Sequence, residues 1–98
     1  MWLGLGSGSA LASLSGCGNA VYLVQASSAT SRVEEAKELG AEELAPYEYT
    51  MAVEHLKKAR EEAANADYGD AISFAEISEE HADKAIRLSR DAHRGAGR

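Results

Sequence analysis

The histidines and their acidic neighbours are the first candidates for chemistry in this sequence. Glu54-His55 and Glu80-His81 each place a carboxylate beside an imidazole, and both groups bind transition metals. The di-iron pattern of helical bundles needs Glu-x-x-His on one helix face, but alanine, serine and arginine stand three residues before His55, His81 and His93. The sequence therefore predicts no metal site, and a metal-binding helical protein is the least favoured functional hypothesis.

Nucleophilic catalysis lacks the partners that such chemistry needs. Ser73, Ser78 and Ser89 have no base and acid that the sequence can pair with them, and no Gly-x-Ser-x-Gly elbow occurs. The glycine- and serine-rich stretch at residues 4–9 lies inside an uncharged N-terminal segment. We expect no enzyme, no bound cofactor and no small-molecule substrate.

The composition is that of a small helical protein. Of 98 residues, 27% are charged and 6% are aromatic, and a single proline occurs, so long helices are favoured over strands. All 16 acidic and all 10 basic residues follow Cys17, and the net charge of −6 argues against nucleic-acid binding. The lone cysteine excludes an intramolecular disulfide.

Cys17 ends the uncharged N-terminal segment of small and apolar residues. This segment is shorter than the roughly 20 apolar residues that a membrane-spanning helix needs. Leu14-Ser15-Gly16-Cys17 resembles the lipobox of bacterial lipoprotein signal peptides, in which an apolar residue and two small residues precede the cysteine. The resemblance implies a signal peptide at residues 1–16 and cleavage between Gly16 and Cys17.

By the same resemblance Cys17 carries covalent lipid, and residues 17–18 form the lipidated N-terminus. Two or three acyl chains anchor a protein stably, because each buried CH₂ contributes about 0.8 kcal/mol. Gly18 stands where an aspartate commonly retains lipoproteins in the inner membrane. The expected location is therefore the inner leaflet of the outer membrane, facing the periplasm. The alternative is that Cys17 is a free thiol in a glycine-rich leader.

Apolar spacing after Cys17 predicts three helices separated by short breaks. Gly40 ends the first helix, Pro46 suits the first turn of the second after a loop, and Asp67 can cap the third. The fold class is all-α, an antiparallel hairpin with a third N-terminal helix, as either a three-helix bundle or a hairpin on a helical stalk. The predicted spans are 19–39 for the first helix and 46–92 for the hairpin, with helices at about 46–65 and 68–92.

Small side chains line the expected contact between the two hairpin helices. In the third helix alanine or serine recurs at alternating intervals of four and three residues, which permits close approach of a partner helix. These small residues of the third helix and the apolar residues of the second helix together form a predicted packing seam. Its members are Leu56, Ala59, Ala63, Ala71, Ala75, Ala82 and Ala85.

The charges of the chain are segregated along its length. Residues 34–83 hold 15 acidic and 4 basic side chains, whereas residues 84–98 hold five basic side chains and one aspartate. In the third helix, about a third of the circumference carries cations that could contact anionic lipid, cell-wall carboxylates or an acidic protein, namely Lys84, Arg87, Arg90 and Arg94. The alternative is that these cations complement the helix dipole and that residues 93–98 are a frayed basic tail.

Three short patterns carry a resemblance to a known family. They are Pro46-Tyr47-Glu48, Leu-x-x-Ala-Arg-Glu-Glu-Ala at 56–63, and Asp-Tyr-x-x-Ala at 67–71. The stretch that contains them resembles the short helical lipoproteins of Gram-negative bacteria known as domain of unknown function 4398. These are mostly packing positions, so the family implies a location and a fold but no catalytic residues. The stretch is also similar to a single tetratricopeptide hairpin, which would need self-assembly because a repeat groove takes about three units.

These observations predict a membrane-anchored periplasmic lipoprotein that acts as a non-catalytic tethering module of the cell envelope. In this hypothesis lipid on Cys17 fixes one end, and the helical part binds an envelope protein or a second copy. The alternative hypothesis is a cell-envelope binding module whose basic C-terminal helix contacts peptidoglycan or anionic lipid.

Overall fold

The computed structural model describes the backbone of residues 4–97 and the side chains of residues 18–97. Its helices, in chain order, are α1 (Gly4–Glu38), α2 (Ala41–Leu44), α3 (Pro46–Ala64) and α4 (Tyr68–Ala96). No strand occurs in this described part, so the all-α prediction is confirmed. The molecule is elongated, with principal extents of 76 × 20 × 14 Å.

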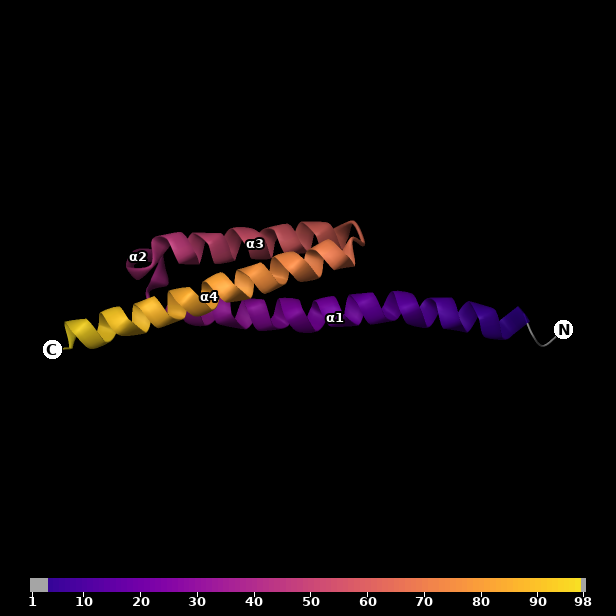
Figure 1. Cartoon of the computed structure of the whole chain (residues 1–98), viewed down its shortest axis with the longest axis horizontal. Coiled ribbons are helices and arrows are strands. Elements are labelled where there is room, and N and C mark those ends of the chain that lie inside the picture. Colours follow the sequence, from indigo (N-terminus) through magenta and orange to yellow (C-terminus); the bar gives the residue numbers. More distant parts are fainter. Residues whose placement is uncertain (1–3, 98) are drawn as a thin grey trace.

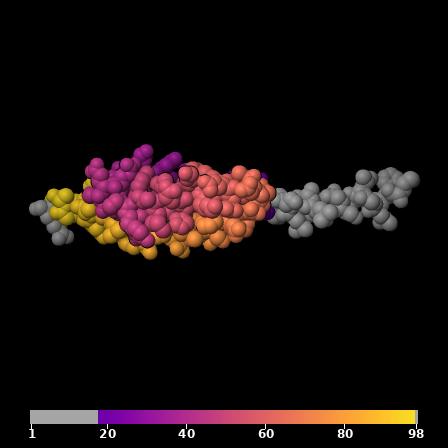
Figure 2. Space-filling model, turned by 90° about the horizontal axis from the view of Figure 1, so that it is seen from above, coloured from indigo at the N-terminus to yellow at the C-terminus, as the bar shows by residue number. Residues whose placement is uncertain are grey.

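Helix α4 is the central element of the bundle. It runs antiparallel to α3 in a hairpin and parallel to α1, which lies along its other side (Figure 1). Both neighbours contact α4 far more than they contact each other. Of the two predicted arrangements, the three-helix bundle is present. In the space-filling view from above, α3 covers much of the visible face and α4 lies along one edge (Figure 2).

A stripe of small side chains explains how α4 takes two neighbours. Four of its alanines and two of its serines have no exposed surface: Ala71, Ala75, Ser78, Ala82, Ala85 and Ser89. Because they recur every three or four residues, they lie on one side of the helix. Short side chains let the backbones of adjacent helices approach closely, so the core is built mainly from alanine contacts.

Two clusters make up the core, one toward each end of the hairpin. Near the α3–α4 turn, Tyr22 of α1 packs against Ala59, Ala71 and Ala75. The Tyr22 and Tyr68 rings are tilted against each other with centroids 6.2 Å apart. Near the α1–α2 connection, the second cluster contains Ala36, Ala41, Ala45, Ala85 and Ile86, and Tyr49 of α3 packs against it.

Backbone conformation at two residues shapes the connections. Gly40 has a φ of 84° in the left-handed region, where its N–H donates to the carbonyl of Lys37 at 3.0 Å and ends α1. Ala66, between α3 and α4, has a φ of 61° although it carries a Cβ. Pro46 occupies the first turn of α3, where its missing N–H has no helical partner to lose.

The structure differs from the sequence predictions at several boundaries. The predicted loop after Gly40 contains the single-turn helix α2, and α1 begins at Gly4 instead of near residue 19. Asp67 stands at the N-cap position of α4, where its carbonyl accepts the first helical hydrogen bond from Ala71, but its side chain makes no capping hydrogen bond.

Helix α4 also extends to Ala96, past its predicted end at 92, so most of the predicted frayed tail at 93–98 is helical. A hydrogen bond to another helix end supports this extension: His93 Nε2 donates to the carbonyl of Leu39 at 2.7 Å. The end of α4 is thereby joined to the end of α1.

Exchanging the residue types at the two left-handed positions should have opposite effects. Gly40→Ala forces a Cβ into the left-handed region and should lower the free energy of unfolding by about 1 kcal/mol, whereas Ala66→Gly relieves the same strain and should raise it by a similar amount. Urea denaturation followed by circular dichroism measures both. Equal destabilisation by the two substitutions would contradict the assigned backbone conformations.

The two buried serines of α4 should respond differently to removal of the hydroxyl. Ser78 Oγ donates to the Ala52 carbonyl at 2.7 Å, so Ser78→Ala should cost about 1 kcal/mol of unfolding free energy. Ser89 Oγ is buried without a partner among the described residues, so Ser89→Ala should leave stability unchanged or raise it by up to about 1 kcal/mol. The same urea titrations separate the two, and the reverse order of stabilities would disprove the assignment.

Candidate functional site

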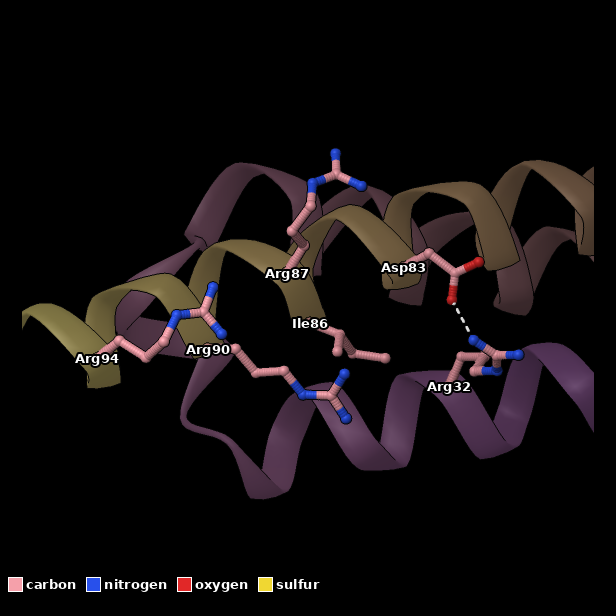
Figure 3. Close-up of a pocket in the computed structure, with 6 residues that line it drawn as sticks. All are labelled: Arg32, Asp83, Ile86, Arg87, Arg90 and Arg94. Atoms are coloured by element: carbon pink, nitrogen blue, oxygen red, sulfur yellow. Dashed lines mark hydrogen bonds and ion pairs between the residues drawn. The ribbon is translucent and has the colours of Figure 1, made fainter.

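Arginines from two helices line a groove between α1 and α4. The groove has a volume of about 360 Å³, and the buried side chain of Ile86 lies on its floor. Its walls carry Arg32 from α1 and Asp83, Arg87, Arg90 and Arg94 from α4 (Figure 3). We refer to this surface as the arginine groove.

Ion pairs hold three of the four guanidinium groups in place. Arg32 Nη1 lies 2.6 Å from Asp83 Oδ1, Arg90 Nη2 lies 2.6 Å from Glu35 Oε1, and Arg94 is paired with Asp91. All three pairs are solvent-exposed, and such pairs contribute only about 0–1 kcal/mol each. They can therefore be exchanged at small cost for a ligand that offers carboxylates or phosphates.

Arg87 forms no ion pair with any residue that the structure describes. Its three paired neighbours are balanced by three carboxylates, so one unbalanced positive charge remains at the edge of the groove, where the Arg87 guanidinium points away from α1 (Figure 3). A guanidinium group presents planar donors that match carboxylate and phosphate oxygens, so the arrangement is chemically suited to an anion.

Three of the four cations predicted to share a surface do line this groove, and the fourth does not. Lys84 is exposed but lies roughly a quarter of a turn away around α4, because successive residues are rotated by about 100°. Sequence reasoning missed Arg32, which comes from α1 and reaches the groove only through the packing of α1 on α4. No signal in the sequence links Arg32 to a helix some 50 residues later.

The histidine pair lies elsewhere, between α3 and α4. His81 Nδ1 donates to Glu48 Oε2 at 2.5 Å, and His55 Nδ1 donates to the Met51 carbonyl at 2.7 Å. The two rings stack with centroids 5.8 Å apart. Among the described residues, no group of three or more His, Cys, Asp or Glu side chains is placed to hold a metal ion.

The predicted packing seam lies in the interior of the hairpin. Six of its members are buried: Leu56, Ala59, Ala71, Ala75, Ala82 and Ala85. Ala63 is half-buried and packs against the cluster around Tyr22. The seam is therefore filled by α1 and α3 of the same chain and leaves no room there for a partner.

Comparison with known proteins assigns the chain to a family. The model of the family described as "Domain of unknown function (DUF4398)" matches residues 24–94. The chain belongs to the DUF4398 family. Neither the curated proteins nor the solved structures contain a match to it. The matched region covers α2 and α3 completely, and it covers the arginine groove as well.

The N-terminal end of this DUF4398 chain has an exposed apolar surface. Val21, Leu23 and Val24 are 55%, 56% and 73% exposed, whereas Tyr22 between them is 8% exposed and packs into the core. The apolar side chains thus face away from the bundle at the start of its described part. We call Val21, Leu23 and Val24 the apolar collar. The collar begins four residues after Cys17. The predicted cleavage and lipidation residues, Gly16 and Cys17, lie outside the residues whose side chains are described.

The described helices of this DUF4398 chain include none whose length and hydrophobicity suffice to cross a bilayer.

A second groove separates α1 from α3. It has a volume of about 440 Å³, and its floor is apolar, with Val33, Tyr49, Val53 and Leu56. Burial of the Tyr49 phenol, followed by the negative charge of nearby Glu42, raises the pKa of Tyr49 above 10.0. This α1–α3 groove exists because both helices pack on α4 and touch each other little.

Proposed function

We propose that this DUF4398 chain is a lipoprotein, anchored through lipid on Cys17 to the inner leaflet of the outer membrane, that acts in the periplasm as a non-catalytic tether. The lipobox-like sequence Leu14-Ser15-Gly16-Cys17 supports the lipid attachment. The helical bundle supports a role in binding, because cationic side chains line two of its surface grooves.

The apolar collar is the observation that carries the proposal. Exposed apolar side chains normally occur singly, whereas Val21, Leu23 and Val24 lie within four residues of one another shortly after the proposed lipidated residue, and Val21 and Val24 line one surface depression. Serines follow on the same helix at 27 and 28, and in the part of α1 whose side chains are described no large apolar side chain after Val24 is exposed. A membrane surface that holds the lipid would also cover this collar.

The bundle starts at the proposed anchor without a flexible linker. A Cβ at Gly18 would lie 3.7 Å from Tyr68 Cβ, so residue 18 is already packed on α4. Glu35, which borders the arginine groove, is 18 residues beyond Cys17 in the same helix, a distance of about 27 Å at 1.5 Å per residue. In a molecule standing on its anchor, the arginine groove lies toward the end of the bundle that is far from the membrane.

Mass spectrometry of the membrane fraction tests the anchor. After expression of the native gene, the intact mass should fit residues 17–98 with two or three acyl chains, and Cys17→Ala should abolish that species. A matched variant, Val21→Ser/Val24→Ser, should keep the lipid but be extracted from the membrane at lower detergent concentration, because it lacks the collar. An unmodified chain that begins at Met1 would refute the lipoprotein assignment.

The arginine groove favours a second function, in which the chain binds cell-envelope anions. Its distance from the anchor exceeds the Debye length of about 8 Å at physiological ionic strength, so lipid head groups of the anchoring leaflet are beyond its reach. Peptidoglycan carboxylates on the periplasmic side meet both the charge and the position of the groove. The two functions are compatible, since a tether needs a contact at each end.

Charge-neutralising variants test this second function. In sedimentation with purified peptidoglycan sacculi, Arg87→Gln/Arg90→Gln should bind about tenfold more weakly than the wild type, and salt should weaken wild-type binding. The control Lys58→Gln/Lys84→Gln removes the same charge outside the groove and should bind normally. Equal losses in both variants would indicate general charge attraction, and binding of the wild type to phosphatidylglycerol vesicles but not to sacculi would refute a peptidoglycan contact.

A further inference from the structure

The cations at the rim of the α1–α3 groove are the basis of a further inference. Residues 34–83 contain four basic side chains, and three of them line this groove: Lys37, Lys57 and Arg60. If basic side chains were placed at random in this acidic segment, they would lie apart from one another and beside carboxylates. The fourth, Lys58, lies outside the groove and pairs with Glu61 and Glu62.

The three rim cations have no carboxylate partner among the described residues. No ion pair joins any of them to an acid, and Arg60 Nη2 instead donates to the hydroxyl of Thr30 at 3.2 Å. Glu34 is the single acidic residue that lines the groove. A chain with a net charge of −6 thus keeps a cationic rim free at this position.

The floor between these cations is apolar and extended. Val33 comes from α1, and Tyr49, Val53 and Leu56 come from α3, at positions one helical turn apart. From Tyr49 to Arg60 the groove follows α3 for 11 residues, which is about 16 Å or three turns. An apolar floor with charged borders is the surface that binds an amphipathic helix.

We propose that the α1–α3 groove binds an acidic amphipathic helix of another protein. The apolar stripe of this helix contacts Val33, Val53 and Leu56, and its flanking carboxylates pair with Lys37, Lys57 and Arg60. The bound helix completes a four-helix arrangement around α1, α3 and α4. The inference names the partner class of the proposed tether, and its biological meaning rests on that proposal.

A second copy of the chain does not supply such a helix from its described residues. The exposed large apolar side chains are those of the collar together with Leu44, Tyr47 and Leu88. Leu44 belongs to a single-turn helix, and Leu88 stands next to Arg87 in the basic part of α4. Neither Leu44 nor Leu88 belongs to an apolar stripe with acidic borders that extends over three helical turns. The proposed occupant is therefore a different protein.

The size of the groove sets the expected affinity. A helix of about three turns buries less than the roughly 1,200 Å² of a standard stable interface, so a dissociation constant in the micromolar range is expected. Unpaired cations at the rim make the affinity dependent on salt and favour acidic over basic helices.

The direct test is fluorescence anisotropy with a defined peptide. The probe is a labelled 14-residue helix with leucine at the a and d positions and glutamate at the flanking positions; a control peptide has lysine in place of each glutamate. The protein is the full chain carrying Cys17→Ala, so that binding is measured without lipid. The glutamate peptide should bind at micromolar concentration, and the lysine peptide should bind at least tenfold more weakly.

Matched protein variants locate the binding surface. Lys37→Glu/Lys57→Glu reverses the rim and should weaken binding at least tenfold, whereas Lys58→Glu/Lys84→Glu makes the same change in net charge outside the groove and should shift the affinity less than twofold. Val53→Ser leaves the charge unchanged and should weaken binding three- to tenfold. Circular dichroism confirms that each variant is folded, since the changed lysines are exposed.

Several outcomes would overturn the inference. These are no binding at millimolar peptide, equal binding of both peptides, equal effects of the two double variants, or a wild-type dimer that dissociates in the Lys37→Glu/Lys57→Glu variant. Failure here is distinct from failure of the anchor. A chain that is lipidated but binds no acidic helix keeps the anchor proposal, and one that binds the helix without lipidation keeps this inference.

Discussion

The close contact that α4 makes with two helices at once is the constraint on which the rest of the structure depends. Six of the seven buried positions of α4 are alanine or serine, so the backbones of both α1 and α3 can approach α4 closely. Because α4 occupies the centre, its neighbours are held apart. Two grooves beside α1 follow from this geometry. The arginine groove lies between α1 and α4, and the α1–α3 groove, with lysines at its rim, lies between α1 and α3.

The packing also decides which charges meet. Three side-chain contacts join α1 to α4: Gln25 with Glu79, Arg32 with Asp83, and Glu35 with Arg90. The contacts follow the same order along both helices, which fixes the parallel alignment of α1 on α4. The two ion pairs are exposed and contribute little energy individually, and the Gln25–Glu79 hydrogen bond is partly buried. Their role is to select one register from several that an alanine surface would accept, since small side chains interlock weakly.

Much of the fold could be predicted because it depends on local and periodic signals. The alternating spacing of small residues in α4, Pro46 at the start of α3 and Gly40 after α1 each act within a few residues, and the structure has the hairpin that they indicate. The side-chain cap expected from Asp67 is absent: its carbonyl accepts the first hydrogen bond of the helix, from Ala71, but its carboxylate accepts none from the first turn. Helix α4 continues past its predicted end at residue 92. The hydrogen bond from His93 to the carbonyl of Leu39, which is distant in sequence, supports this continuation.

The candidate sites depended on tertiary contacts and were only partly predictable. Periodicity brought Arg87, Arg90 and Arg94 to one face of a helix, but the choice between α1 and α3 as the neighbour of that face is made by packing. The α1–α3 groove gave no sequence signal for a similar reason. Lys37 and Lys57 are 20 residues apart on different helices, and their common position is visible only when both helices lie on α4.

The packing of Gly18 on Tyr68 sets an order of events in the biogenesis of the chain. Residues 16 and 17 are helical and adjacent to this contact, so cutting the bond between them in the finished bundle would require the start of α1 to unwind and leave α4. Under the proposed maturation, lipid transfer and cleavage therefore come before α1 docks. In that order of events, the hairpin of α3 and α4, whose contacts are local in sequence, would form first, and α1 would join it after the proposed cleavage.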